Sequence, residues 1–286
     1  MSGEASLRVA LVQLEPSNAL PDATLLRATG ARVRTAMCAA AESGARLVVF
    51  PEATMMYPGK RIISRSAPNL DGADWTKADW GAQRDELEQV ASLSRELGLW
   101  TVVGGLHWLS ADRRPHNSLY VFSDQGLLVT RYDKRRISQN ELTYLFTPGT
   151  EPVAFDVHGF RIGLVVCLET LFPDYFVEYA DNDVDLVVIA SAGGGIFGQL
   201  AQSYAAITGM TIGLAVAVTP DPDPAKTGAC GPYGWLDRIE DNEPGMVVVD
   251  VAKCDGASSF HRRARRGLYD SAIDRTEPRS LDRQTL

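Results

Sequence analysis

The sequence predicts a layered α/β sandwich in which mixed β-sheets are covered by helices. Two observations predict this fold class. Strand and helix patterns alternate near both ends of the chain, whereas a series of strands joined by short turns fills residues 99–166. Crossover helices join parallel strands and short turns join antiparallel strands, so both connections together indicate mixed sheets with helical cover.

The first unit is strand, helix and strand. Residues 7–14 are β-rich and alternate in polarity, which is typical of a strand. Residues 22–43 carry apolar side chains at helical spacing and stop before Gly44, a residue type that commonly ends helices. Residues 46–50 form a short apolar run stopped by Pro51, as expected of a buried strand.

The remaining elements follow from the same signals. Residues 58–79 are rich in Gly, Pro, Asn and Asp, which predicts an irregular segment. Helices are predicted at 79–97, 174–180 and 199–209. Strands are predicted at 99–106, 118–123, 126–132, 153–157, 161–166, 185–190, 212–219, near 228–236, and at 245–251.

Composition limits the function classes. A chain of 286 residues with 45% hydrophobic content can bury a large core, and no linker-like stretch divides it. We therefore expect one domain over residues 1–270 and a polar, poorly ordered tail over 271–286. The net charge of −8 makes a nucleic-acid partner unexpected. No apolar run approaches a membrane span and no signal peptide is recognised, so we expect a cytoplasmic protein with no membrane partner.

The cysteines are widely spaced along the chain, at Cys38, Cys167, Cys230 and Cys254. None lies close in sequence to another cysteine or to a histidine, so neither a disulfide framework nor a zinc site is predicted. The sequence predicts no metal site and no cofactor.

Cys167 is the candidate nucleophile. It ends the predicted strand 161–166 and precedes the helix that begins after Pro173. A turn from strand to helix exposes its side chain at the mouth of a sheet and directs backbone N–H groups at the same point, which suits a nucleophile and its oxyanion. The alternative is a small buried hydrophobic residue, which is the commoner use of a cysteine.

A nucleophilic thiol needs a base. The histidines are His107, His116, His158 and His261, and a Cys–His protease stays open, although none carries a recognisable local signature. We expect His107, at the end of a strand, to line a pocket. Glu52 is the better base, because it follows a buried strand and a desolvated carboxylate can act near neutral pH. A surface residue after a proline turn is the alternative for Glu52.

Lys134 is the candidate cation for a developing oxyanion, since it also ends a predicted strand. The alternative for Lys134 is a solvated charge cluster, which is the usual meaning of a basic run.

The three segments LVVFPEAT, TRYDKRRI and GLVVCLETLFPD, in this order, resemble the Glu–Lys–Cys triad of the nitrilase, or carbon–nitrogen hydrolase, superfamily. The segments ALVQLEP, HNSLYVFSDQGLLVTRYDK, LFTPGTEPVAFDVHGFRIGLVVC and RRARRGLY resemble the framework of the same family. The resemblance covers about residues 7–269.

This resemblance implies a four-layer α-β-β-α sandwich that usually pairs with a second subunit. It implies that Glu52 takes the thiol proton, that Cys167 forms a thioester, and that Lys134 and the backbone N–H of Leu168 stabilise the oxyanion. Many members carry a second glutamate, for which Glu141 in QNELTYLFTPG is the match. Glu141 could instead be an ordinary loop residue.

The substrate is less well defined by the sequence. Residues 168–172, directly after Cys167, contain no arginine, whereas members of the family that cleave carbamoylated amino acids have an arginine shortly after the cysteine, which binds a carboxylate. Glu169 either accepts hydrogen bonds from the backbone around Cys167, which we favour, or faces the substrate. The aromatic candidates for the pocket are Tyr57, Trp108 and Phe197. The glycines within 191–198 either line the pocket or form a flexible loop.

Three functions remain open at this point. The first is an amidase-type hydrolase of a small amide, carbamoyl compound or nitrile, acting as a homodimer or higher homo-oligomer. The second is an acyltransferase that passes the same thioester to an amine. The third is a non-catalytic binding protein that kept the fold.

Overall fold

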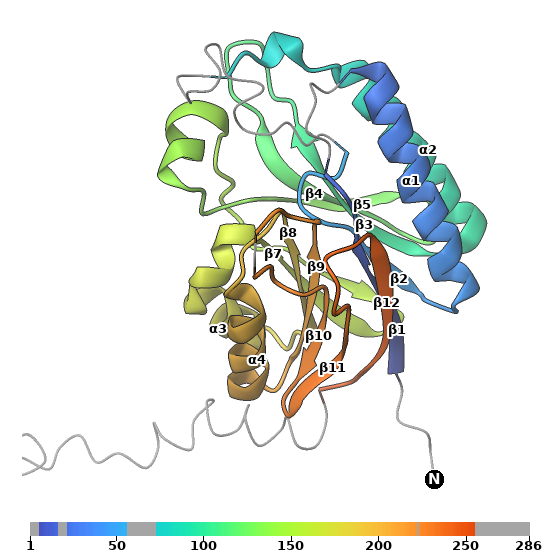
Figure 1. The fold of residues 1–286 in the computed structure, drawn as a ribbon, viewed down its shortest axis with the longest axis vertical. Helices are drawn as coiled ribbons and strands as arrows, with labels where there is room; N and C mark the ends of the chain where they lie inside the picture. The colour runs from blue at the N-terminus through green and yellow to red at the C-terminus, as the bar shows by residue number, and fades with distance from the viewer. Residues whose placement is uncertain (1–5, 17–21, 56–72, 222, 255–286) are drawn as a thin grey trace, which may run out of the picture.

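The computed structural model describes residues 6–16, 22–55, 73–221 and 223–254, and it has the predicted four-layer architecture. Two six-stranded sheets pack face to face, with α1 and α2 on one outer side and α3 and α4 on the other (Figure 1). The helices are α1 (Ala23–Glu42), α2 (Trp80–Leu97), α3 (Pro173–Asp181) and α4 (Phe197–Thr208).

The first sheet has the strand order β12-β1-β2-β3-β4-β5. Its central strands β1, β2 and β3 are parallel, and the strands at both sides pair antiparallel with them. The strands are β1 (Ser6–Gln13), β2 (Leu47–Val49), β3 (Trp100–His107), β4 (His116–Phe122), β5 (Leu128–Asp133) and β12 (Gly245–Ala252).

The second sheet repeats this plan in the order β11-β10-β9-β8-β7-β6, with β7, β8 and β9 parallel. The strands are β6 (Ala154–Val157), β7 (Phe160–Val166), β8 (Leu186–Ser191), β9 (Thr211–Val216), β10 (Gly228–Gly231) and β11 (Gly234–Arg238). Each sheet therefore presents a set of parallel strand ends, where polar side chains can meet.

Three apolar layers hold the sandwich together. The layer between the sheets includes Leu11, Val102 and Ile162, while separate clusters fill the space beneath α1 and α2 and beneath α3 and α4. Every residue of β2 and of β8 is buried, which explains why these strands read as unbroken apolar runs. Burial of this area supplies the main driving force for folding.

Local signals define the helix ends much as the sequence predicts. The Asp22 side chain accepts a hydrogen bond from the N–H of Leu25 at the start of α1. At the start of α2 the Asp79 side chain accepts a hydrogen bond from the N–H of Ala82. The helix ends at Gly98, which is in the left-handed conformation with a φ of 60°. Pro173 occupies the first turn of α3, where its missing N–H leaves no bond unmade.

The structure also contains features that the sequence did not resolve. The segment expected near 228–236 is a hairpin of β10 and β11. Three short helical turns interrupt the predicted loops, at Trp75–Lys77, Glu141–Leu145 and Cys167–Leu171. The expected tail 271–286 and the residues 58–72 lie outside the described part of the chain. No helix within the described ranges is long and apolar enough to cross a membrane.

A substitution at Gly163 tests how closely the second sheet packs against α3. A Cβ atom at this position in β7 would lie 2.7 Å from the ring of Tyr179, whose hydroxyl is anchored by donating to the Leu164 carbonyl at 2.6 Å. We expect Gly163→Ala to lower the free energy of unfolding by about 1–3 kcal/mol in urea titrations. Gly81→Ala, at an exposed position early in α2, is the matched control and should leave it unchanged or slightly higher. Equal effects of both variants would contradict the packing argument.

Candidate active site

Three strand ends bring the candidate catalytic side chains together. Glu52 follows β2, Lys134 follows β5 of the same sheet, and Cys167 follows β7 of the other sheet. The Lys134 Nζ atom donates to Glu52 Oε1 at 3.0 Å and to Glu141 Oε1 at 3.4 Å. Residues that are far apart in the sequence thus meet at one point between the two sheets.

These charged groups are almost completely withdrawn from solvent. The exposed fractions are 6% for Glu52, 1% for Lys134 and 2% for Glu141. Burial opposes the charge of Lys134, but Glu52, Cys167 and Glu141 outweigh it and hold the lysine pKa well above its usual range. Lys134 is therefore a fixed ammonium ion, and the reading as a solvated charge cluster is wrong.

The backbone around Glu52 is tightly constrained. Ala53 has a positive φ of 53°, and a Cβ atom on the neighbouring Gly104 would lie 2.4 Å from the Ala53 nitrogen. The side chain is fixed by two further donors: Asn117 Nδ2 donates to Oε1 at 2.7 Å, and the Ala192 N–H donates to Oε2 at 3.1 Å. Glu52 is thus held within the site, so the surface alternative is wrong.

Glu141 starts the short helical turn Glu141–Leu145 and is buried beside Lys134. Its Oε2 atom accepts a hydrogen bond from the Ser138 N–H at 2.8 Å, which orients Oε1 toward the ammonium group. The position is a second buried carboxylate of the site and not an ordinary loop residue.

Cys167 lies at a sharp turn. Its φ of 50° is in the left-handed region, which a residue with a side chain rarely adopts outside constrained sites. Burial and the negative charge of Glu52 raise the pKa of the thiol to about 11, while Lys134 and a hydrogen bond with Ser191 act in the opposite direction. With this pKa the thiol is protonated at neutral pH, so a reaction through its sulfur atom would need a base to take the proton.

Leu168 is the second residue of the turn Cys167–Leu171. The first N–H groups of a helical turn have no partner within it, so the chain geometry leaves the Leu168 N–H available for an acceptor near Cys167.

A cavity of about 250 Å³ opens onto Cys167, Glu52 and Glu141. It is lined by Glu52, Ala53, Leu106, Asn117, Glu141, Phe146, Cys167, Ala192, Gly193 and Gly194. Cys167 therefore faces a small space that also contains two carboxylates and an apolar wall. Gly193 and Gly194, in the segment after β8, line the cavity, whereas Gly195 and Gly198 do not.

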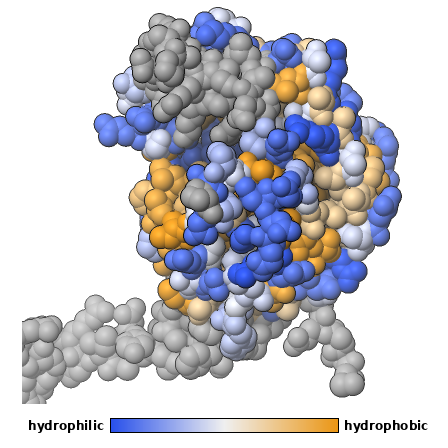
Figure 2. Space-filling model, viewed as in Figure 1, coloured by the Kyte–Doolittle hydropathy of each residue, from blue (hydrophilic) through white to orange (hydrophobic). Residues whose placement is uncertain are grey.

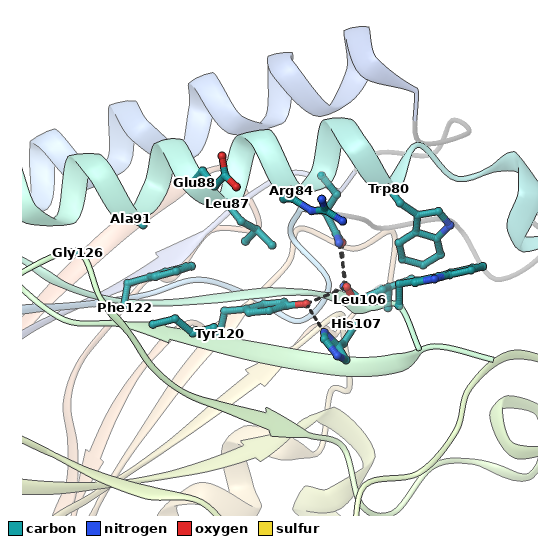
Figure 3. A pocket seen from close by; sticks show the side chains of 13 residues that line it. Trp80, Arg84, Leu87, Glu88, Ala91, Leu106, His107, Tyr120, Phe122 and Gly126 are labelled. Atoms are coloured by element: carbon teal, nitrogen blue, oxygen red, sulfur yellow. Dashed lines mark hydrogen bonds between the residues drawn. The ribbon is translucent and has the colours of Figure 1, made fainter. Parts of the chain in front are cut away.

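A second, larger cavity of about 430 Å³ lies between α2 and the outer face of β3 and β4 (Figure 3). In it, the Tyr120 hydroxyl donates to the Leu106 carbonyl at 3.1 Å and lies 3.2 Å from His107 Nδ1, as the dashed lines in Figure 3 show. Its lining contains no cysteine. The smaller cavity, and not the larger one, is the candidate active site.

Several pocket residues expected from the sequence lie elsewhere. His107, the last residue of β3, and Trp108 just after it line the second cavity together with side chains of α2, and neither lines the cavity of Cys167. Phe197 is 5% exposed and lies beneath Gly194 without lining the cavity. Tyr57 lies outside the described residues.

The structure also bears on the other chemistries. His107, His116 and His158, the histidines that the structure describes, do not line the cavity of Cys167. All four cysteines are free thiols. Over the described ranges, no group of three or more His, Cys, Asp or Glu side chains could hold a metal ion.

Asn117 is a site residue that sequence reasoning missed. Asn117 lies on β4 opposite Leu106 in the antiparallel register, and this cross-strand pairing alone brings its side chain to Glu52. The available signal was the short polar pair Asn117–Ser118 at the start of an apolar strand.

Comparison with known proteins shows the family to which the chain belongs. The model of the carbon–nitrogen hydrolase family matches residues 8–215. The chain belongs to the carbon–nitrogen hydrolase family. Within the family it is 30% identical over 230 residues to a hydrolase of Mycobacterium tuberculosis, a match that covers 74% of this chain and 75% of that protein.

Solved structures of the family share the fold. An amidase from Nesterenkonia sp. superposes with a TM-score of 0.70 at 22% identity, covering 92% of this chain and 98% of that one. A cysteine-to-alanine mutant of the amidase from Nesterenkonia sp. AN1, in complex with butyramide, gives a TM-score of 0.72 at 20% identity, covering 96% and 99% of the two chains.

A shorter sequence match links the chain to the human deaminated glutathione amidase. The two are 26% identical over 130 residues, which cover 39% of this chain and 38% of that protein.

The protonated resting state of Cys167 can be measured. Iodoacetamide reacts with thiolates, so the alkylation rate of Cys167, followed by peptide mass spectrometry, should rise about tenfold per pH unit between pH 7 and pH 9. This follows because the thiol pKa of about 11 lies above the whole range. A plateau below pH 8 would show a thiolate preformed at rest and would contradict the account.

Proposed function

We propose that this protein is an amidase-type carbon–nitrogen hydrolase that cleaves a small neutral amide through a thioester on Cys167. The observation that carries the proposal is that the Cys167 thiol and the Glu52 carboxylate line one small cavity, and that the buried Lys134 ammonium ion is hydrogen-bonded to that carboxylate. Family membership supports the reaction class, because the matching family acts on carbon–nitrogen bonds.

The proposed reaction has two halves. As the Cys167 sulfur attacks the carbonyl carbon, Glu52 accepts the thiol proton, and a tetrahedral oxyanion forms. Lys134 Nζ and the Leu168 N–H stabilise this oxyanion. The C–N bond breaks, and the leaving nitrogen takes the proton from Glu52 and departs as ammonia or an amine. Glu52 then removes a proton from water, which attacks the thioester and releases the acid and the thiol.

The second carboxylate gives Lys134 a fixed position. A lysine side chain has several rotatable bonds, and two acceptors hold it in one place before the oxyanion forms. With Glu141 also bound to the ammonium group, Glu52 can exchange protons while the lysine remains in place. We therefore assign Glu141 a role in orienting Lys134 and the substrate.

The cavity favours an uncharged substrate. The two carboxylates and one ammonium ion give its surroundings a net charge of −1, and no arginine is among the described lining residues. The volume of about 250 Å³ and the apolar wall of Leu106 and Phe146 suit a short aliphatic acyl group. The butyramide complex of the Nesterenkonia sp. AN1 amidase mutant supports this choice over a carbamoyl compound or a nitrile.

The alternative functions use the same site. An acyltransferase would pass the thioester to an amine instead of water, so product analysis with and without an added amine separates the two. A non-catalytic binding protein would have no use for the ammonium ion fixed beside Cys167.

Assembly and location remain predictions. A homodimer through the outer face of α3 and α4 is supported by exposed apolar side chains there, and Figure 2 shows apolar surface on the side where α3 lies. These side chains are Leu171, Val177, Ile196 and Ile207. The cytoplasmic location expected from the sequence also stays a prediction.

Turnover of butyramide by variants tests the catalytic roles. Cys167→Ala should abolish ammonia release without changing the fold, since it removes only a small side chain. Glu52→Gln and Lys134→Ala should each cost about 3 kcal/mol of transition-state stabilisation, which is roughly a hundredfold in kcat/KM. Cys38→Ala, at a partly exposed position in α1, is the control and should turn over normally. Normal turnover by Glu52→Gln would refute its role as the base.

Two amides of similar length test the charge argument. Butyramide and succinamate differ mainly in the terminal carboxylate of the latter. We expect kcat/KM for succinamate to be about five- to thirtyfold lower, because repulsion from the two buried carboxylates costs about 1–2 kcal/mol. Steady-state kinetics with both compounds measures the ratio, and equal values would contradict a site selective for neutral substrates.

A further inference from the structure

Glu169 is a buried carboxylate that the proposed reaction does not use. It lies two residues after Cys167 in the turn Cys167–Leu171 and is 0% exposed. It does not line the cavity, so it is not placed to touch a substrate there. A charged group in this position needs strong compensation, because removing a carboxylate from water is costly.

The compensation comes from four hydrogen-bond donors. Oε2 accepts from the Val166 N–H at 2.8 Å and from the Tyr132 hydroxyl at 2.8 Å. Oε1 accepts from the Arg135 N–H at 2.6 Å and from the Arg136 N–H at 3.0 Å. Both oxygen atoms are thus fully used in holding the protein chain. The sequence-based expectation of backbone hydrogen bonds is confirmed.

The four donors belong to residues close in sequence to Cys167 or to Lys134. Val166 directly precedes Cys167, whereas Tyr132 and Arg135 lie on either side of Lys134. Val166 belongs to β7 of the second sheet, and Tyr132 belongs to β5 of the first. One carboxylate therefore connects the strand end that carries the nucleophile with the strand end that carries the ammonium group.

The connection depends on the negative charge. An ionised carboxylate can accept all four hydrogen bonds, whereas a glutamine would direct its NH₂ group at two of the donors. Burial raises the pKa of Glu169, and the hydrogen bonds from Arg136, Val166, Tyr132 and Arg135 oppose that shift.

We propose that Glu169 is a positioning residue that sets the place of the Lys134 ammonium group relative to the Cys167 sulfur, by tying the ends of β5 and β7 to one buried carboxylate. This inference rests on the proposed function of that site. Misplacement of a catalytic group by about 1 Å can cost roughly a hundredfold in rate, so a link of this kind matters for catalysis even without substrate contact.

The segment that follows β5 is also attached to α3 by an ion pair, and this ion pair provides a matched control. The Arg135 side chain pairs with Glu178 of α3 at 2.8 Å, near the surface, and Glu178 is 36% exposed. Glu178→Gln therefore removes a carboxylate that holds the loop through a side chain, while the hydrogen bonds of Glu169 to the backbone remain. An ion pair near the surface is partly screened by solvent and contributes little.

The first test compares kinetics of the full-length variants with a short amide. Glu169→Gln should lower kcat by roughly ten- to a hundredfold with KM changed by less than about threefold, because the cavity wall is intact. Glu178→Gln should keep kcat within about twofold of the unmodified protein. Circular dichroism and thermal unfolding confirm that both variants are folded at the assay temperature.

The second test needs no turnover. Lys134 lowers the pKa of the Cys167 thiol, so a less well placed ammonium group should slow iodoacetamide alkylation of Cys167 at pH 8. We expect a fall of about three- to tenfold in Glu169→Gln, and none in Glu178→Gln. Tyr132→Phe, which removes a single donor, should give a smaller fall of about threefold and serves if Glu169→Gln does not fold.

The outcomes separate the inference from the proposed function. Unchanged kcat and unchanged alkylation in Glu169→Gln, or equal losses in Glu178→Gln, would overturn the positioning role. If the unmodified protein hydrolyses no amide, the proposed function fails, and the alkylation rates still decide whether Glu169 governs the surroundings of Cys167.

Discussion

The candidate active site depends on one buried ion cluster, in which the Lys134 ammonium group pairs with the carboxylates of both Glu52 and Glu141. Each charge would be costly in the protein interior without the others. The cluster is therefore complete only when the ends of β2 and β5 and the turn at Glu141–Leu145 are in their final positions. The geometry of this ion cluster is consequently a product of the whole fold, and no single segment supplies it.

The four-layer sandwich explains why the cluster lies beside a thiol. Two sheets of the same plan pack face to face, and strand ends from both contribute to one cavity. The first sheet supplies the carboxylate and the ammonium group, and the second supplies Cys167. Glu169 bridges the two sheets at this point through hydrogen bonds to β5 and to β7. The chemistry assigned to the site, proton removal from sulfur followed by stabilisation of an oxyanion, requires such fixed positions.

Much of this could be predicted from sequence because the informative residues follow predicted strands. Cys167 comes directly after the apolar strand β7, Glu52 follows β2 after Phe50 and Pro51, and Lys134 comes directly after β5; strand ends meet at sheet edges. The pocket wall could not be predicted in the same way. Which face of β3 bears His107 depends on sheet register, and the contact of Asn117 with Glu52 depends on cross-strand pairing. Both are tertiary properties without a local pattern.

The most direct test of the account is to identify the covalent intermediate. The protein is mixed with butyramide, quenched in acid during turnover, digested and examined by peptide mass spectrometry. The account predicts a butyryl group on the peptide that contains Cys167 and on no other cysteine peptide. Release of ammonia with no acyl group on Cys167 at any quench time, or acylation of a different residue, would contradict it.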